Sequence, residues 1–172
     1  MEQYLQQART LIEALPYIRK FNQSVVVIKY GGSAMNDPHR QESIIQDIAL
    51  MKLVGMKPVV VHGGGPHINL MLERLGVSSQ FHNGLRVTDD ETMAIVEMVL
   101  SGQINKRIVE EFQRQGIRAV GISGKDGGTF LAEKKACSDM DLGWVGEIQS
   151  VQPDLLQTLM DNDFVPVIAP IA

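Results

Sequence analysis

The chain has 172 residues, of which 44% are hydrophobic, and its 16 Lys and Arg against 20 Asp and Glu side chains give a net charge of −4. This balance offers no basic surface for nucleic acid or for an anionic membrane. The single cysteine, Cys137, excludes an internal disulfide, and no apolar run reaches the roughly 20 residues that span a bilayer. We therefore expect a cytoplasmic domain large enough to bury a core, with no nucleic-acid or membrane partner.

The N-terminal segment predicts an amphipathic helix. Residues 4–20 repeat apolar side chains at helical spacing, among them Leu5, Ile12 and Leu15. This helix precedes the first expected strand, so it is an appendage to the rest of the chain. Its apolar stripe could pack on its own domain or on another subunit, and the sequence leaves both possibilities open.

Short buried strands then alternate with helices. Val25 to Ile28 is an uninterrupted apolar run, which is typical of a strand in a parallel sheet covered on both faces. Asn36-Asp37-Pro38 provides a cap and a first-turn proline for a helix, and Thr88-Asp89-Asp90-Glu91 is a capping box for another, which Gly102 is expected to interrupt. Further strands are expected at 57–61, 117–122 and 164–168, and helices at 38–54, 68–75, 88–100, 104–115 and 153–160.

Two β-hairpins are expected outside the parallel sheet. Residues 81–87 place the pair Asn83-Gly84 between short apolar flanks, which is the strongest short-range hairpin signal. Residues 130–134 and 144–148 form the second candidate pair.

Glycine turns follow the first two expected strands. Lys29 and Tyr30 lead into Gly31-Gly32, and His62 leads into Gly63-Gly64-Gly65. Glycine lets backbone N–H groups approach an anion closely, and the lysine adds a positive charge beside them. The carboxyl ends of parallel strands share one edge of a sheet, so this pattern indicates an edge that handles phosphate. An ordinary pair of turns with one solvated lysine is the alternative.

Several familiar motifs are absent or incomplete. The glycines form neither G-x-x-x-x-G-K-[ST] nor G-x-G-x-x-G. A serine hydrolase would need G-x-S-x-G, but the nearest match, residues 121–125, ends in lysine. His62 and His67 are not spaced as the helical pair of a zinc protease, and local hydrogen bonding is the simpler role for each. No residue of the chain is therefore predicted to bind a metal.

The motifs that remain resemble those of the amino acid kinase family. They are V-I-K-Y-G-G ending at Gly32, V-V-H-G-G-G-P ending at Pro66, and N-G-L-R-V-T at 83–88, with further similarity at 121–127 and 143–147. The hairpin motif resembles the branch of the family that phosphorylates N-acetyl-L-glutamate. The resemblance implies a three-layer α/β sandwich with a mostly parallel sheet, and it implies transfer of phosphate from Mg-ATP to the side-chain carboxylate of N-acetyl-L-glutamate, the second step of arginine biosynthesis.

The resemblance also implies roles for the residues of the first turn. Lys29 would be the catalytic residue that stabilises the moving phosphoryl group, and the amides of Gly31 and Gly32 would bind phosphate oxygens. A carboxylate with a pKa of about 4.3 is already ionised at pH 7, so the reaction requires no general base. Catalysis then consists of positioning and charge neutralisation.

The second turn and the first hairpin would bind the acceptor. By the resemblance, the amides of Gly64 and Gly65 contact the substrate. Arg86 would hold the α-carboxylate of the substrate in a bidentate pair while the hairpin covers the site. An exposed hairpin arginine without a ligand is the alternative interpretation of Arg86.

The N-terminal helix resembles an extra helix of arginine-inhibited, hexameric members of the family. The resemblance implies that residues 1–20 form an oligomerisation helix, that the whole protein is a hexamer, and that L-arginine is a feedback inhibitor that binds near Tyr17. Residues 21–172 would then form the N-acetylglutamate-binding lobe.

The length of the chain departs from the family pattern. Such kinases exceed about 200 residues, and their second half carries most of the ATP site. We therefore expect an incomplete kinase that is inactive alone, whose strand at 164–168 exposes an unpaired edge and an apolar face. A non-catalytic binding or assembly module, or a family member with another acceptor, is the alternative.

Overall fold

Four parallel strands form the central sheet in the order β1-β2-β8-β5. They are β1 (Val25–Tyr30), β2 (Lys57–His62), β8 (Val165–Ala169) and β5 (Ala119–Ser123). The computed structural model describes residues 1–35 and 37–172, so Asn36, expected to contribute to a helix cap, lies outside the described residues. Every pairing within this sheet is parallel, which confirms the predicted fold class.

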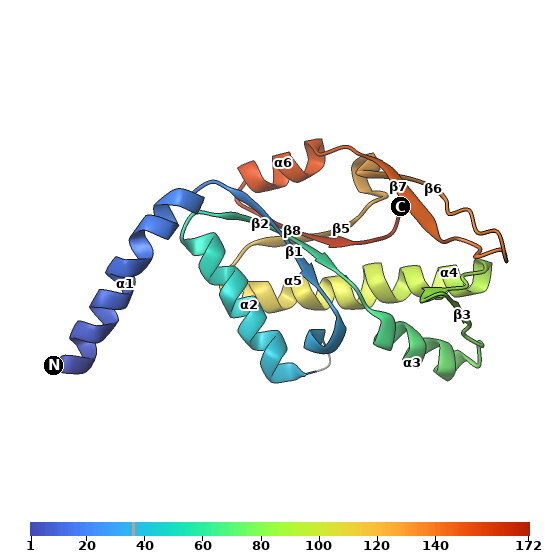
Figure 1. The fold of residues 1–172 in the computed structure, drawn as a ribbon, viewed down its shortest axis with the longest axis horizontal. Helices are drawn as coiled ribbons and strands as arrows, with labels where there is room; N and C mark the ends of the chain where they lie inside the picture. Colours follow the sequence, from blue (N-terminus) through green and yellow to red (C-terminus); the bar gives the residue numbers. More distant parts are fainter. Residues whose placement is uncertain (36) are drawn as a thin grey trace.

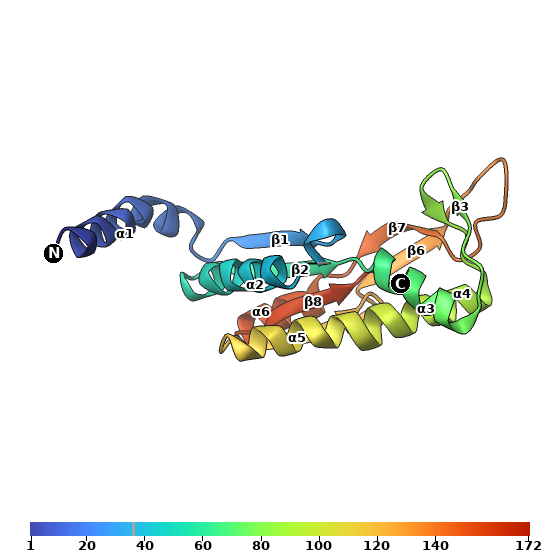
Figure 2. The same cartoon turned by 90° about the horizontal axis from the view of Figure 1, so that it is seen from below.

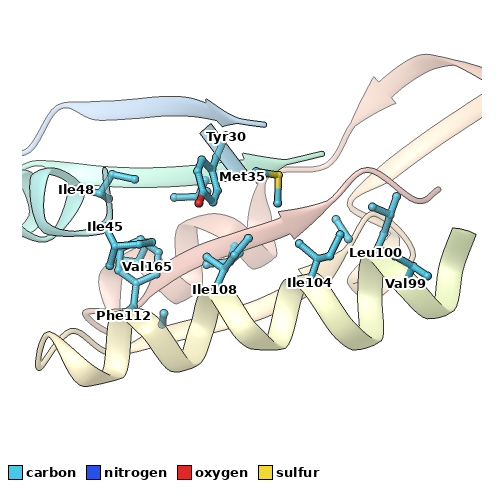
Figure 3. Packing of buried hydrophobic residues seen from close by; sticks show 14 of the residues in the cluster. Tyr30, Met35, Ile45, Ile48, Val99, Leu100, Ile104, Ile108, Phe112 and Val165 are labelled. Carbon is cyan, nitrogen blue, oxygen red and sulfur yellow. The ribbon is translucent and has the colours of Figure 1, made fainter. Parts of the chain in front are cut away.

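Helices cover both faces of the sheet, as Figure 1 shows. Helices α2 (Pro38–Leu53) and α5 (Asn105–Arg114) lie on one face, and α6 (Asp154–Asp161) lies on the other. The larger core cluster lies under α2 and α5, where Phe112 is completely buried and Ile45 and Val165 pack around it (Figure 3). The expected three-layer sandwich is therefore present.

β8 is not the exposed strand with an unpaired edge that the sequence predicts. β8 lies between β2 and β5, and all five of its residues are buried. The predicted unpaired edge at 164–168 is therefore wrong. The edges of the sheet are β1 and β5, and the uncovered apolar side chains of the sheet are Val25 and Val27 of β1.

One long helical segment runs from Asp90 to Arg114. Helix α4 (Asp90–Glu97) continues through a π-helix, η2 (Met98–Ile104), into α5, so Gly102 lies within helical structure and does not interrupt it. The cap also differs from the expected capping box. Asp89, and not Thr88, is the N-cap residue, and its carboxylate accepts the N–H of Thr92 at 2.8 Å. Thr88 instead donates its hydroxyl to the carbonyl of Arg86.

Both expected hairpins are present. Strands β3 (Phe81–His82) and β4 (Leu85–Arg86) are antiparallel, and positive φ angles of 49° at Asn83 and 80° at Gly84 form the tight turn between them. Strands β6 (Phe130–Lys134) and β7 (Gly146–Val151) form the second hairpin. Helix α3 (Gly65–Leu75) and two short 3-10 helices, η1 (Gly32–Met35) and η3 (Asp126–Gly128), complete the fold.

Helix α1 (Glu2–Phe21) extends away from the sheet, as both Figure 1 and Figure 2 show. None of its residues is buried, although Leu11, Ile12 and Tyr17 are large apolar or aromatic side chains. The stripe of α1 therefore does not pack on its own domain. Within residues 1–35 and 37–172, no helix combines the length and the apolar composition that crossing a membrane requires.

The turn after β2 packs tightly on η2, which leads to a prediction about two neighbouring glycines. A Cβ on Gly64 would lie 2.3 Å from Ile104 Cδ1 and 2.6 Å from Leu100 Cδ2, whereas a Cβ on Gly65 would have no heavy atom within 4 Å. Because Leu100 and Ile104 are themselves buried, we expect Gly64→Ala to lower the free energy of unfolding by about 1–3 kcal/mol. Gly65→Ala is the matched control and should change it by less than about 0.5 kcal/mol. Urea unfolding curves measure both values, and equal losses would contradict the packing described.

Candidate functional site

The two glycine turns meet at one edge of the sheet. Tyr30 and His62 are register partners at the ends of β1 and β2, and the N–H of Gly63 donates to the carbonyl of Tyr30 at 2.8 Å. A Cβ placed on Gly31 would lie 3.6 Å from the nitrogen of Gly63. The predicted neighbourhood of the two turns is therefore present, and Gly31, Gly32, Gly64 and Gly65 belong to a single edge.

Lys29 lies one residue before the end of β1, on the exposed side of the strand. Among the described residues, no carboxylate forms a salt bridge with it. A lysine at this position therefore keeps its positive charge available next to the first glycine turn.

The second turn presents backbone donors. Helix α3 begins at Gly65, and within the described residues neither Gly64 nor Gly65 donates its N–H to a protein acceptor. The first N–H groups of a helix have no partner inside the helix, and the helix dipole makes this end positive. This end of α3 can therefore bind an anion.

Arg86 is held beside α3 by uncharged partners. Its guanidinium donates to Ser79 Oγ and to Asn69 Oδ1, and it stacks on the ring of Phe81 with 4.6 Å between Cζ and the ring centroid. Partial burial lowers the pKa of Arg86. No described carboxylate pairs with it, so an anionic ligand would find a positioned and uncompensated charge.

The segment after Arg86 is fixed by the loop between β6 and β7. The N–H of Thr88 donates to the carbonyl of Leu142 at 3.0 Å, and the N–H of Trp144 donates to the carbonyl of Thr88 at 2.7 Å. The indole of Trp144 also donates to the carboxylate of Asp90 at 2.6 Å. These bonds join the two hairpins, so the hairpin that carries Arg86 is anchored at its base.

A cavity of about 900 Å³ lies between α4 and the β6–β7 hairpin. Met93 and Leu100 line it from the helical side, and Phe130, Trp144 and Ile148 line it from the hairpin side. Val87, next to Arg86, also lines it. The arrangement can hold an anionic group at Arg86 and an apolar group in the neighbouring cavity.

Tyr17 is not brought to this edge. It lies on α1, exposed, and α1 precedes the amino end of β1, whereas the glycine turns follow the carboxyl ends of the strands (Figure 1). Within the described residues, no group of three or more His, Cys, Asp or Glu side chains is arranged to hold a metal ion.

Sequence reasoning missed a buried polar pair beneath the second turn. His62 does bond locally to Gly63, as expected, but its other ring nitrogen contacts Asn105 at 3.2 Å. The two residues are 43 positions apart, so no local pattern could have linked them. The partners of Arg86, Asn69 and Ser79, lie 17 and 7 positions from it and were also missed.

Comparisons with known proteins show curated relatives along nearly the whole chain. An acetylglutamate kinase of Methylobacillus flagellatus is 54% identical over 96% of this chain and 59% of its own length, and one of Carboxydothermus hydrogenoformans is 51% identical over 99% and 61%. The chain thus spans about three fifths of the length of these relatives.

Similarity to solved structures concerns the fold. N-acetylglutamate synthase from Neisseria gonorrhoeae, complexed with coenzyme A and N-acetyl-glutamate, superposes with a TM-score of 0.79 at 20% identity, covering 95% of this chain and 37% of that one. A structure of that synthase with coenzyme A and L-arginine superposes with a TM-score of 0.69 at 20% identity, covering 92% and 38%. The family model described as "Amino acid kinase family" matches residues 24–172, and the chain therefore belongs to the amino acid kinase family.

Proposed function

We propose that residues 21–172 form the N-acetylglutamate-binding lobe of a kinase that phosphorylates the side-chain carboxylate of N-acetyl-L-glutamate with ATP, the second step of arginine biosynthesis. The observation that carries this proposal is the meeting of the two glycine turns, through the 2.8 Å bond from Gly63 to Tyr30, beside Arg86, which has no carboxylate partner among the described residues. The relatives at 51–54% identity, named acetylglutamate kinases, support the same acceptor.

The proposed reaction needs positioning more than proton transfer. An oxygen of the ionised side-chain carboxylate forms a bond to the γ-phosphorus of ATP, the bond from that phosphorus to the β–γ bridging oxygen breaks, and ADP leaves with the electron pair. The product is an acyl phosphate. Two anions must approach one another, so the positive charge of Lys29 and the amides of Gly31 and Gly32 would lower the barrier by stabilising the transferred group.

The acceptor would be oriented by Arg86 and by the second turn. Arginine has five N–H donors, and Ser79 and Asn69 occupy only part of them, so Arg86 retains donors for the α-carboxylate. The free amides of Gly64 and Gly65 would hold further substrate oxygens, and the apolar side chains that line the cavity next to Val87 would accept the acetyl group.

Magnesium would enter this site only as part of the nucleotide substrate. The described residues contain no cluster of carboxylates that fits a resident Mg²⁺ ion, and no step of the proposal depends on one.

We further propose that residues 1–20 form an oligomerisation helix of a hexamer and that L-arginine is a feedback inhibitor bound near Tyr17. Helix α1 buries none of its residues, and it exposes its apolar stripe to solvent. Such a stripe is stable when another subunit covers it. The synthase from Neisseria gonorrhoeae, which shares the fold, has been solved with L-arginine.

The acceptor can be tested by isothermal titration of the chain with N-acetyl-L-glutamate. We expect Arg86→Ala to weaken binding about 10- to 100-fold, because a charge-assisted bidentate pair is lost. Arg118→Ala is the matched control, since Arg118 also stacks on an aromatic ring, that of Phe164 at 3.9 Å, but next to the amino end of β5. Equal heats from the wild type and Arg86→Ala would exclude Arg86 from the site.

The transfer step can be tested by a hydroxamate assay for acyl phosphate with Mg-ATP and N-acetyl-L-glutamate. We expect no turnover by the 172-residue chain, which spans only about three fifths of its relatives' length. A chimera that continues after Ala172 with the sequence of the Methylobacillus flagellatus relative should be active. Lys29→Ala in this chimera should lower the rate far more than it weakens substrate binding. Robust turnover by the unextended chain would refute the assignment of most of the ATP site to the sequence that follows Ala172 in the chimera.

The role of α1 can be tested by light scattering. In the full-length protein, we expect deletion of residues 1–20 to convert hexamers into dimers. Leu5→Asp with Ile12→Asp, which charges the exposed stripe, should do the same, whereas Gln3→Asp with Thr10→Asp on the opposite side of the helix should not. A deletion variant that remains hexameric would show that α1 does not mediate assembly.

A further inference from the structure

A histidine ring is buried directly beneath the second glycine turn. His62 is 1% exposed, and Asn105, at the start of α5, is completely buried. The ring nitrogen Nδ1 of His62 lies 3.0 Å from the carbonyl oxygen of Gly63, and Nε2 lies 3.2 Å from Nδ2 of Asn105. The ring therefore joins the glycine turn to the helix that covers the sheet.

The orientation of the Asn105 amide is fixed by three strands. Its Nδ2 shares its hydrogens among His62, the carbonyl of Val167 in β8 at 2.9 Å, and the carbonyl of Ile122 in β5 at 3.3 Å. Its Oδ1 accepts a hydrogen bond from Lys106 Nζ at 3.1 Å. The opposite orientation would place the amide oxygen against two carbonyl oxygens, so it is strongly disfavoured.

This orientation selects the tautomer of His62. The amide Nδ2 of Asn105 can only donate, so Nε2 of the ring must accept. The proton of the neutral ring then lies on Nδ1, from which it donates to the carbonyl of Gly63. The hydrogen-bond network thus assigns one tautomer among the two that a neutral histidine can adopt.

Holding the carbonyl of Gly63 also sets the direction of a donor in the candidate site. The carbonyl of Gly63 and the N–H of Gly64 belong to one planar trans peptide, so they point in opposite directions. Because the carbonyl is turned toward the buried ring, the N–H of Gly64 points away from it. Among the described residues, no protein group accepts this N–H.

We propose that His62 and Asn105 are positioning residues that hold the Gly64 amide toward the substrate, and that they do so only while His62 is neutral and carries its proton on Nδ1. The identity of that substrate rests on the function proposed above, but the positioning itself does not. Neither residue is assigned a contact with the reacting atoms.

The surroundings of the ring favour its neutral form. Burial lowers the pKa of His62 from 6.5, although its hydrogen bond to Gly63 opposes this shift. Among the ionisable groups of the adjoining elements, Tyr30 is the register partner of His62 in β1, and Lys106 bonds to Asn105. A second proton on Nε2 would face the NH₂ group of Asn105, which is itself a donor. The pKa of His62 is lower in the folded chain than its usual value of 6.5. The neutral ring therefore contributes to stability in full above about pH 6.5, and this contribution is lost as the pH falls below that value.

The decisive measurement is the tautomer of His62 in the ¹⁵N-labelled chain, read from long-range ¹H–¹⁵N NMR spectra at pH 7. We expect the Nδ1–H form for His62, and the other three of the four histidines provide references in the same spectrum. A His62 ring that is protonated on Nε2, or on both nitrogens, at this pH would overturn the proposal. This experiment needs neither a variant nor a ligand.

Asn105→Asp tests the coupling between the pair and the turn. The variant replaces the donor that faces Nε2 with an acceptor, so we expect the proton of His62 to move to Nε2 or a second proton to bind, and the Gly64 amide resonance to shift. Affinity for N-acetyl-L-glutamate should fall about tenfold. Asn162→Asp, the same change at an exposed position, should alter none of these readings.

The outcomes separate this proposal from the proposed function. If the wild-type chain does not bind N-acetyl-L-glutamate, the tautomer and the Gly64 resonance still decide the positioning role. If binding depends on Arg86 but Asn105→Asp changes neither the Gly64 resonance nor the affinity, the positioning proposal is wrong and the function stands. If Asn105→Asp does not fold, the wild-type tautomer at pH 7 remains decisive.

Discussion

The parallel pairing of β1 with β2 is the constraint on which the site depends. The pairing places Tyr30 opposite His62, and it extends past the end of β2 through the bond from Gly63 to Tyr30. Because both strands run in the same direction, the turn that follows Lys29 and the turn that begins α3 lie at one edge. An antiparallel pair would have put these turns at opposite ends of the sheet.

The π-helix η2 allows the helical segment after the first hairpin to contact the second glycine turn through two neighbouring residues. In a π-helix, more residues occupy each turn than in an α-helix, so neighbouring positions can both face inward. Ile104 packs on Gly64 while the next residue, Asn105, reaches His62, and both side chains are buried. A single helical segment therefore supplies both the apolar support and the polar support of the second turn.

Local patterns predicted the elements but not the arrangement that depends on distant contacts. The apolar runs of β1 and β2 and the Asn83-Gly84 turn encode strands and a turn within a few residues, and these elements were predicted correctly. The expected cover on both faces of β1 is wrong, because Val25 and Val27 are exposed. The central position of β8 depends on pairing with β5 and β2, whose register partners are 46 and 107 positions away in sequence, so a run of apolar residues could not reveal it. The N-cap was misassigned to Thr88 because Thr88 and Asp89 are adjacent candidates. Which of them caps the helix depends on the hydrogen bond that the hydroxyl of Thr88 donates to the carbonyl of Arg86, which leaves Asp89 as the cap. In the site, the glycine turns were predicted from sequence, whereas the partners of Arg86 and His62 were not.

The charge of the site is local and does not follow from the net charge of −4. At the amino end of the sheet, Lys52 pairs with Asp163 and Lys57 pairs with Asp161, so these cations are neutralised. At the carboxyl end, Lys29 and Arg86 have no carboxylate partner among the described residues, and the start of α3 adds the positive end of its dipole. An acidic protein can therefore attract an anion to one edge, because acidic side chains neutralise cations elsewhere and leave these two unpaired. The same arrangement explains why Arg86 has neutral partners: Ser79 and Asn69 fix the position of the guanidinium without cancelling the charge that an anionic substrate would meet.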